Sequence, residues 1–172
     1  SVLMADEDTS KVFGQDISRE SIREIEFVKI KKVQVPSEVW TVSDDKSKEI
    51  WAWIEHTDHA AILKIASRNG VHANPNCHNL FAGYTNVRKI EFNNLFDTSL
   101  VTNMRSMFCK CRCLQKIDIS GFNTALVTNM RQMFCGCRTL EEIDVSHFDT
   151  SNVTDMSQMF CGCRILKEVD VR

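Results

Sequence analysis

The chain has 172 residues, of which 43% are hydrophobic and 26% charged, so it has the size and composition of one globular domain rather than of a disordered protein. The 21 Lys and Arg residues against 23 Asp and Glu residues give a formal net charge of −2, which excludes a basic surplus for binding nucleic acid. No apolar run is long enough to span a bilayer, and residues 1–13 do not resemble a signal peptide.

The first part of the chain predicts a tail followed by strands. Residues 1–20 are polar and aperiodic, which predicts a flexible tail. In residues 21–35 apolar and charged residues alternate, which predicts a strand. Two shorter apolar segments, 50–54 and 61–66, also read as strands. We therefore expect a β-rich N-terminal cap over residues 21–76, which covers the open end of the repeats that follow.

The rest of the chain is an internal repeat. Segments that begin at Phe96, Phe122 and Phe148 superpose without a gap at an offset of 26 residues, and a weaker copy precedes them at an offset of 27. Each copy ends in an L-x-x-I-x-V type of pattern, which is the spacing of leucine-rich repeats. The repeat region covers residues 77–172, about three and a half repeats, and forms one continuous folded unit with the cap.

Each repeat carries a helical pattern followed by a strand pattern. Val127, Met130, Met133 and Phe134 have the spacing of the apolar stripe of a short helix, with Thr128 as a candidate N-cap. The apolar residues after them alternate with acidic ones, which predicts a strand with one apolar face. A single repeat cannot bury its own apolar face, so the repeats are expected to stack. Met133 and Phe134 are expected in the core.

These features predict an α/β fold class. We expect a leucine-rich-repeat-like right-handed solenoid with a parallel β-sheet and short helices, preceded by the β-rich N-terminal cap.

The sequence of residues 148–171, FDTSNVTDMSQMFCGCRILKEVDV, closely resembles the repeats of BspA-like leucine-rich-repeat surface proteins, also called mycoplasma-lipoprotein-type repeats. Asn123 and Ala125 depart from this pattern in the preceding copy, and residues 22–76 resemble the segment that precedes such repeats. The resemblance implies a secreted or cell-surface bacterial binding module, typically used for adhesion. It implies no catalytic residues.

Seven of the eight cysteines lie between Cys109 and Cys163, where C-x-C recurs in each repeat. Equivalent residues of stacked repeats lie about 4.8 Å apart, so each cysteine position forms a column. Three interpretations stay open: buried apolar side chains, disulfides between neighbouring repeats, and zinc ligation. The C-x-C spacing without a matching pair of histidines argues against zinc, and we expect neither a metal nor another cofactor.

Charged residues recur at outward-facing strand positions. The candidate partner-binding face consists of Glu91, Lys116, Asp118, Glu142, Asp144, Glu168 and Asp170. This face is either an ordinary solvated strand surface or an acidic stripe that binds a partner. A column of Arg112, Arg138 and Arg164 has two interpretations as well: ion pairs with acidic residues of the neighbouring repeat, or a basic edge for a partner.

No enzyme signature accompanies these columns. His56 and His59 lack the glutamate and the spacing of zinc peptidases, and no nucleophile elbow, P-loop or dinucleotide motif occurs. We expect a non-catalytic, extracellular or cell-surface module that recognises a protein or glycan. The alternatives are a metal- or redox-responsive protein that uses the cysteine ladder, and a purely structural stalk. The last repeat lacks a cap, so we also expect a fragment of a longer array, or an end-to-end homodimer.

Overall fold

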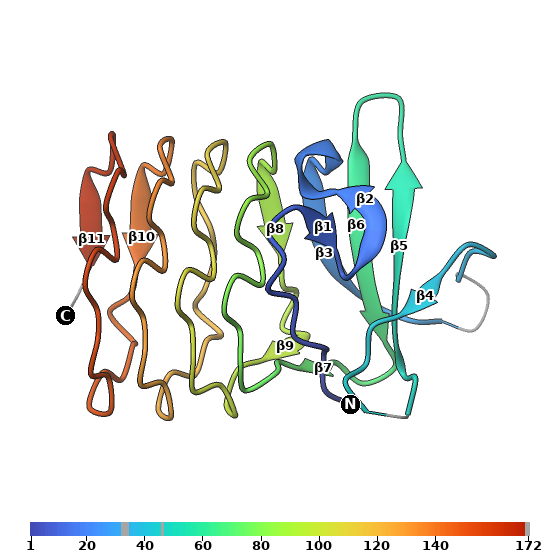
Figure 1. Ribbon diagram of the computed structural model, residues 1–172, viewed down its shortest axis with the longest axis horizontal. Helices are drawn as coiled ribbons and strands as arrows, with labels where there is room; N and C mark the ends of the chain where they lie inside the picture. The colour runs from blue at the N-terminus through green and yellow to red at the C-terminus, as the bar shows by residue number, and fades with distance from the viewer. Residues whose placement is uncertain (32–34, 46, 171–172) are drawn as a thin grey trace.

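A row of stacked chain segments adjoins a mixed β-sheet in the computed structural model (Figure 1), which describes residues 1–31, 35–45 and 47–170. The elements in chain order are β1 (Lys11–Val12), β2 (Gln15–Ser18), the 3-10 helix η1 (Arg19–Ser21), β3 (Glu24–Lys29), β4 (Trp40–Thr41), β5 (Ile50–His56), β6 (Ala61–Ser67), β7 (Val71–His72), β8 (Lys89–Glu91), β9 (Phe96–Asp97), β10 (Glu142–Asp144) and β11 (Glu168–Asp170). Positions 32–34 of the expected strand and positions 171–172 of the expected repeat region lie outside the described residues.

The expected fold class, an α/β leucine-rich-repeat-like right-handed solenoid with a parallel β-sheet and short helices, is wrong. The fold is β-rich, and η1 is the only helix within the described ranges. The largest sheet is mixed and has the order β4-β5-β6-β3-β8, antiparallel from β4 to β6 and parallel from β6 to β8. The antiparallel pair β1-β2 and the pairs β7-β9 and β10-β11 are separate sheets. No helix in the described parts of the chain is long and apolar enough to cross a membrane.

Turns replace the helices that the sequence predicted. In an α-helix every amide would donate to the carbonyl four residues earlier. Here the amides of Met130, Gln132 and Phe134 instead donate to carbonyls of the next repeat, at 2.8, 3.0 and 2.9 Å. Gln132 has φ 57°, and Gly136 has φ 77°. Such left-handed residues interrupt a right-handed helix. The spacing of the apolar residues correctly predicted that their side chains are buried, but successive turns can bury side chains at this spacing as well as a helix can.

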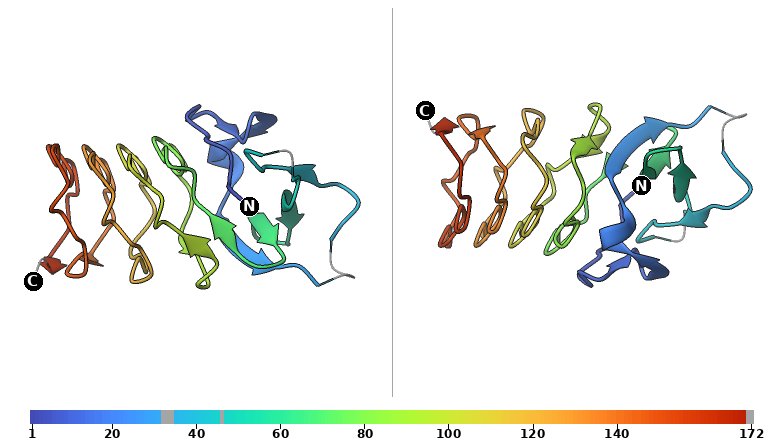
Figure 2. Two further views of the ribbon diagram at one scale, coloured as in Figure 1. Left: turned by 90° about the horizontal axis from the view of Figure 1, so that it is seen from below. Right: turned by 90° about the horizontal axis from the view of Figure 1, so that it is seen from above.

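Neighbouring repeats are joined by backbone hydrogen bonds and by a column of parallel bridges, so the repeats lie side by side (Figure 2). The bridges join Asn76 to Asn103, Asn103 to Asn129, and Asn129 to Asp155. Each of these side chains accepts a hydrogen bond through Oδ1 from the amide two residues later, at 2.9 to 3.0 Å. This local bond satisfies the turn without help from the next repeat.

The repeats share an apolar core in which aromatic rings stack from one repeat to the next. Phe108, Phe134 and Phe160 follow Phe81, with ring centroids 5.6, 5.3 and 5.6 Å apart along the column. Met133 and Phe134 are fully buried, which confirms the prediction that they belong to the core. The flat stacking of the rings follows from repetition, because equivalent residues take equivalent rotamers.

The N-terminal segment differs from the expected flexible tail. Residues 1–20 contain β1 and β2 and pack against the first repeat, with Leu3 and Val12 fully buried. The chain passes so close to Gly83 that a Cβ there would lie 2.6 Å from the carbonyl oxygen of Thr9. This close approach requires glycine at position 83, whose φ is +75°.

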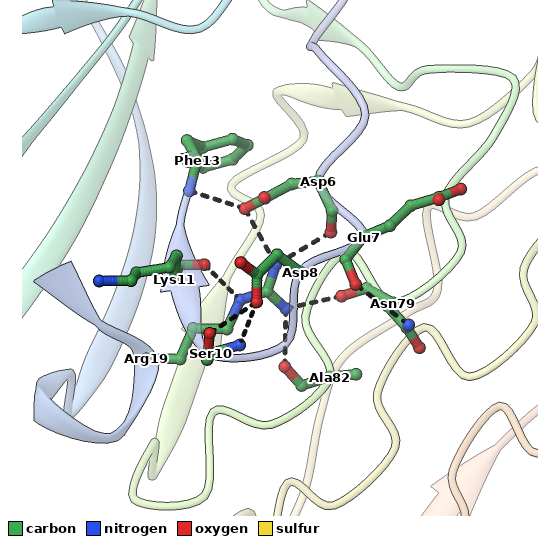
Figure 3. Close-up of polar contacts among 9 residues, drawn as sticks. All are labelled: Asp6, Glu7, Asp8, Ser10, Lys11, Phe13, Arg19, Asn79 and Ala82. Atoms are coloured by element: carbon green, nitrogen blue, oxygen red, sulfur yellow. Dashed lines mark hydrogen bonds and ion pairs between the residues drawn. The ribbon is translucent and has the colours of Figure 1, made fainter. Parts of the chain in front are cut away.

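A buried arginine holds this segment in place (Figure 3). The guanidinium of Arg19 is fully buried and donates to the carbonyls of Asn79 and Ala82, both at 2.7 Å, and of Asp6 at 2.9 Å. It also forms a 2.9 Å ion pair with the Asp6 carboxylate and lies 4.8 Å from the ring centroid of Tyr84. Burial raises the pKa of Asp6, against the lowering influence of Arg19. The polar composition of residues 1–20 predicted a solvated tail. Arg19 instead anchors this segment, because its guanidinium donates to several backbone carbonyls at once.

The turn aspartates make stability depend on acid pH. Hydrogen bonds from Ser99, Ser151 and Ser157 lower the pKa values of Asp97, Asp149 and Asp155 below their usual range. A carboxyl with a lowered folded pKa stabilises the protein above its unfolded pKa of about 3.9, and that contribution is lost as the pH falls through the folded pKa. We therefore expect the melting temperature to fall below about pH 4, as measured by calorimetry across a pH series.

The chain supplies the matched control for this prediction. Asn123 stands where the neighbouring repeats have Asp97 and Asp149, and its Oδ1 accepts the Ala125 amide at 3.0 Å without titrating. The double variant Asp149→Asn with Asp155→Asn should keep the neutral melting temperature and lose less of it in acid. If the melting temperature of the double variant fell with pH in the same way as that of the wild type, the turn aspartates would not cause the loss of stability in acid.

Candidate functional site

The sequence-predicted face lines a groove on the surface of the repeats. The groove has a volume of about 1030 Å³. Six of the seven predicted residues line it: Glu91, Lys116, Asp118, Glu142, Asp144 and Glu168. The seventh, Asp170, lies in β11 in register with Asp144 of β10. The structure therefore brings six of the seven predicted residues together on one hollowed surface rather than on a flat one.

The strands position these side chains by simple alternation. Ile90 and Ile143 are the central residues of β8 and β10 and are 6% and 4% exposed, because their side chains enter the core. Their neighbours along each strand consequently face outward. In β10 and β11 the parallel register places Glu142 beside Glu168. Like charges thus adjoin across the two strands, which raises the electrostatic cost of leaving this face without a positive partner.

The groove runs across an interruption between the strands. β8 belongs to the five-stranded sheet and β10 to a separate pair, whereas residues 115–118 between them carry no strand. Ile117 is only half-buried, unlike Ile90 and Ile143. The Glu141 amide still donates to the Gln115 carbonyl at 2.9 Å, so the segments stay adjacent. The sequence pattern predicted a regular strand here, and the tertiary structure does not form one.

Charge is distributed unevenly along the groove. On the β8 side, Arg88, Lys89 and Glu91 line it, and Lys89 forms a 2.9 Å ion pair with Glu91 that raises the pKa of Lys89. On the β10–β11 side the charged lining residues are all acidic: Glu142, Asp144 and Glu168. Lys116 and Asp118 lie between the two sides. A ligand with positive groups would meet its complement at β10 and β11.

Two predicted residues also have a structural task. The Asp118 Oδ1 accepts the Ser120 amide at 3.0 Å, and the Asp144 Oδ1 accepts the Ser146 amide at 2.9 Å. Hydrogen bonds from these serines, the side-chain contact first, lower the pKa of each aspartate. Both aspartates therefore close turns as well as line the groove. Glu142 and Glu168 are the better probes of binding, because no such turn bond involves them among the contacts of the described residues.

Sequence reasoning missed part of the lining. Arg88, Lys89 and Gln115 line the groove beside the predicted residues, and Glu24 reaches it from β3. The pair Arg88-Lys89 could have been found, because it directly precedes the apolar residue of a strand. Glu24 could not, because its place depends on the pairing of β3 with β8, which joins segments about 65 residues apart.

The cysteines form two columns with different surroundings. All eight are free. The inner column, Cys111, Cys137 and Cys163, donates its thiols to carbonyls of the preceding repeat at 3.2 Å. The outer column is Cys109, Cys135 and Cys161, of which the first two are half-buried and the last is exposed. Among the described residues no group of three or more His, Cys, Asp or Glu side chains is arranged to hold a metal ion.

The arginine column is exposed. Arg112, Arg138 and Arg164 all face solvent. The sequence left open whether they pair with acidic residues of the neighbouring repeat, and no ion pair involves them within the described part of the chain. They lie outside the groove and contribute nothing to its lining.

Comparison with known protein families identifies one match. Residues 75–170, more than half of the chain, match the family described as mycoplasma protein of unknown function, DUF285. Comparisons with curated proteins and with solved structures find no match. The matched range contains every stacked repeat and every residue of the predicted face.

Proposed function

Because the chain belongs to the DUF285 family of mycoplasma proteins, we propose that it is a non-catalytic binding module of the bacterial surface or of the secreted proteins, of the BspA-like kind. Its task is adhesion or recognition of a host or matrix partner. The observation that carries this proposal is the convergence of the predicted face on one groove of about 1030 Å³. A concave surface with converging polar groups is the usual form of a binding site.

The partner we propose is a protein that presents basic side chains to β10 and β11. Glu142, Asp144 and Glu168 offer adjacent negative charges there. Complementary charge mainly sets which partner binds and how fast. The mixed charge on the β8 side suits the acidic and basic groups of a protein surface better than a uniformly anionic glycan.

Charge reversal at the groove is expected to weaken binding without unfolding the protein. The double variant Glu142→Lys with Glu168→Lys should lower affinity for its partner about tenfold or more, because like charges then oppose the basic groups. Binding is measured by biolayer interferometry in two series, one with immobilised matrix proteins and one with immobilised neutral and sulfated glycans. The melting temperature should stay near that of the wild type.

Glu141 supplies the matched control for this experiment. It is exposed and directly precedes Glu142, but it does not line the groove. Glu141→Lys makes the same change of charge as each of the two substitutions in the double variant and should leave binding unchanged. Equal losses of affinity in Glu141→Lys and in the double variant would show that the effect comes from the net charge of the protein and not from the groove. Unchanged binding in both variants would show that the groove is not the binding site. Binding to glycans alone would show that the partner is not a protein.

The proposed partners include a second copy of this chain that meets the repeat at residues 148–170 end to end. Met156 and Ile165 of this repeat are 49% and 45% exposed. Phe160 is half-buried, whereas the equivalent Phe134 is fully buried between two rings. Covering such apolar surface favours association.

A further inference from the structure

The two cysteine columns differ in what their thiols contact. In the inner column, each thiol donates to a backbone carbonyl, and Cys111 and Cys137 are fully buried. Burial raises the pKa of Cys111 to about 12 and that of Cys137 as well. Because oxidants do not reach fully buried thiols, Cys111 and Cys137 contribute to packing rather than to thiol chemistry.

The outer column is built differently, because its cysteines lie in turns whose backbones are hydrogen-bonded directly to one another. The Lys110 amide donates to the Cys135 carbonyl at 2.7 Å, and the Gly136 amide donates to the Cys161 carbonyl at 2.6 Å. These bonds hold three successive turns in register. Cys135 consequently lies between Cys109 and Cys161 of the neighbouring repeats, and the pKa of its thiol is raised by burial first and by both of these cysteines as well. Cys161 is exposed and gives the column access to solvent.

We propose that the outer column is an oxidative modification site, in which Cys135 forms a disulfide with either Cys109 or Cys161. Stacked neighbours are about 4.8 Å apart, within the range of about 4.4–6.8 Å that disulfides span between Cα atoms. Cys109 and Cys161 are two repeats apart and exceed that range. Cys135 is therefore a member of either disulfide, and one thiol of the column always stays reduced.

A peroxide is the oxidant that this site requires. The thiolate of the exposed Cys161 attacks one oxygen of hydrogen peroxide, the O–O bond breaks, and the leaving hydroxide takes a proton to become water. The resulting sulfenic acid is attacked by the thiolate of Cys135. The S–S bond then forms, the S–O bond breaks, and the second water leaves. Two thiols are oxidised and one peroxide is reduced to two waters.

The third thiol lets the disulfide move along the column. With Cys135 and Cys161 joined, the thiolate of Cys109 can attack the sulfur of Cys135, and the S–S bond to Cys161 breaks with release of its thiolate. This exchange needs no oxidant. Burial raises the pKa of Cys135 to about 11, so both oxidation and exchange should accelerate as the pH rises above neutral.

The test is oxidation of the full chain by hydrogen peroxide, followed by intact mass and by peptide mapping without reduction. The wild type should lose the mass of two hydrogen atoms, form no disulfide between two chains and melt at a higher temperature than its reduced form. Cys135→Ser should form no intramolecular disulfide. Cys109→Ser and Cys161→Ser should each keep one, because each retains a stacked pair that includes Cys135.

The inner column provides the control. Cys137→Ser, whose fold is checked by circular dichroism, should still form the outer disulfide, and it removes the ambiguity between Cys135 and Cys137 within one tryptic peptide. Trypsin cleaves after Lys110 and Arg112, so Cys109 is already separated from Cys111. Wild-type yield of an intramolecular disulfide in Cys135→Ser would overturn the proposal. A disulfide within the inner column, or oxidation of Cys161 to sulfinic acid without any disulfide, would overturn it equally.

Discussion

Phe134→Ala is expected to lower the free energy of unfolding by about 3–5 kcal/mol, the range of other truncated core aromatics. Phe134 is fully buried, and its ring stacks on Phe108 at 5.3 Å and on Phe160 at 5.6 Å, with interplanar angles of 4° and 3°. Removing the ring leaves a cavity between two repeats and abolishes both stacking contacts. Urea unfolding followed by tryptophan fluorescence or circular dichroism measures the change.

The same column contains the control for this substitution. Phe160→Ala removes an identical ring that is only half-buried and that, among the described residues, stacks on Phe134 alone. Its cost should be clearly smaller than that of Phe134→Ala. A loss of stability below about 1 kcal/mol for Phe134→Ala would be incompatible with a buried aromatic column. Equal losses for Phe134→Ala and Phe160→Ala would show that burial between two rings adds no stability.

Arg19→Met is expected to cost about 3–5 kcal/mol, because it leaves the Asp6 carboxylate buried without its countercharge. The substitution also removes the donors that serve the Asn79 and Ala82 carbonyls at 2.7 Å. These contacts attach residues 1–20 to the first repeat, so the loss should be local first. Hydrogen exchange should show faster amides in residues 1–20 than in the stacked repeats, and chemical unfolding gives the total loss of stability.

A second variant separates the charge from the packing. Asp6→Asn in the Arg19→Met background removes the buried charge, while the amide oxygen can still accept from Phe13, as the carboxylate does at 2.8 Å. Part of the stability should return. Asp16→Asn, which removes the exposed ion pair of Lys11 and Asp16, should leave the melting temperature nearly unchanged. If Arg19→Met behaves like Asp16→Asn, the cluster does not anchor the segment.

The groove and the outer cysteine column are independent of one another. Among the described residues that line the groove, Cys109, Cys135 and Cys161 do not occur. Charge reversal at Glu142 and Glu168 therefore leaves the disulfide chemistry intact, and Cys135→Ser leaves the charged face intact. Each proposal can fail without affecting the other.

Features that depend on periodicity can be predicted from the amino-acid sequence alone. An offset of 26 residues places Phe108, Phe134 and Phe160 in one column, and alternation around Ile143 determines which side chains face outward. The same alternation explains why six of the seven residues of the predicted face line a single groove, while their role in binding stays a prediction. Buried and exposed positions follow from spacing alone when a unit repeats without gaps.

The partners of the backbone hydrogen bonds, in contrast, depend on how the repeats pack against one another. The apolar spacing from Val127 to Phe134 fits a helix, yet alternate amides there bond to the next repeat, and Gln132 adopts a left-handed φ of 57°. Likewise, polar composition cannot reveal that Arg19 finds carbonyl partners about 60 residues away, at Asn79 and Ala82. Local propensity ranks the conformations of a segment by itself, whereas hydrogen bonds to a stacked neighbour or a distant loop exist only once the chain has folded around them.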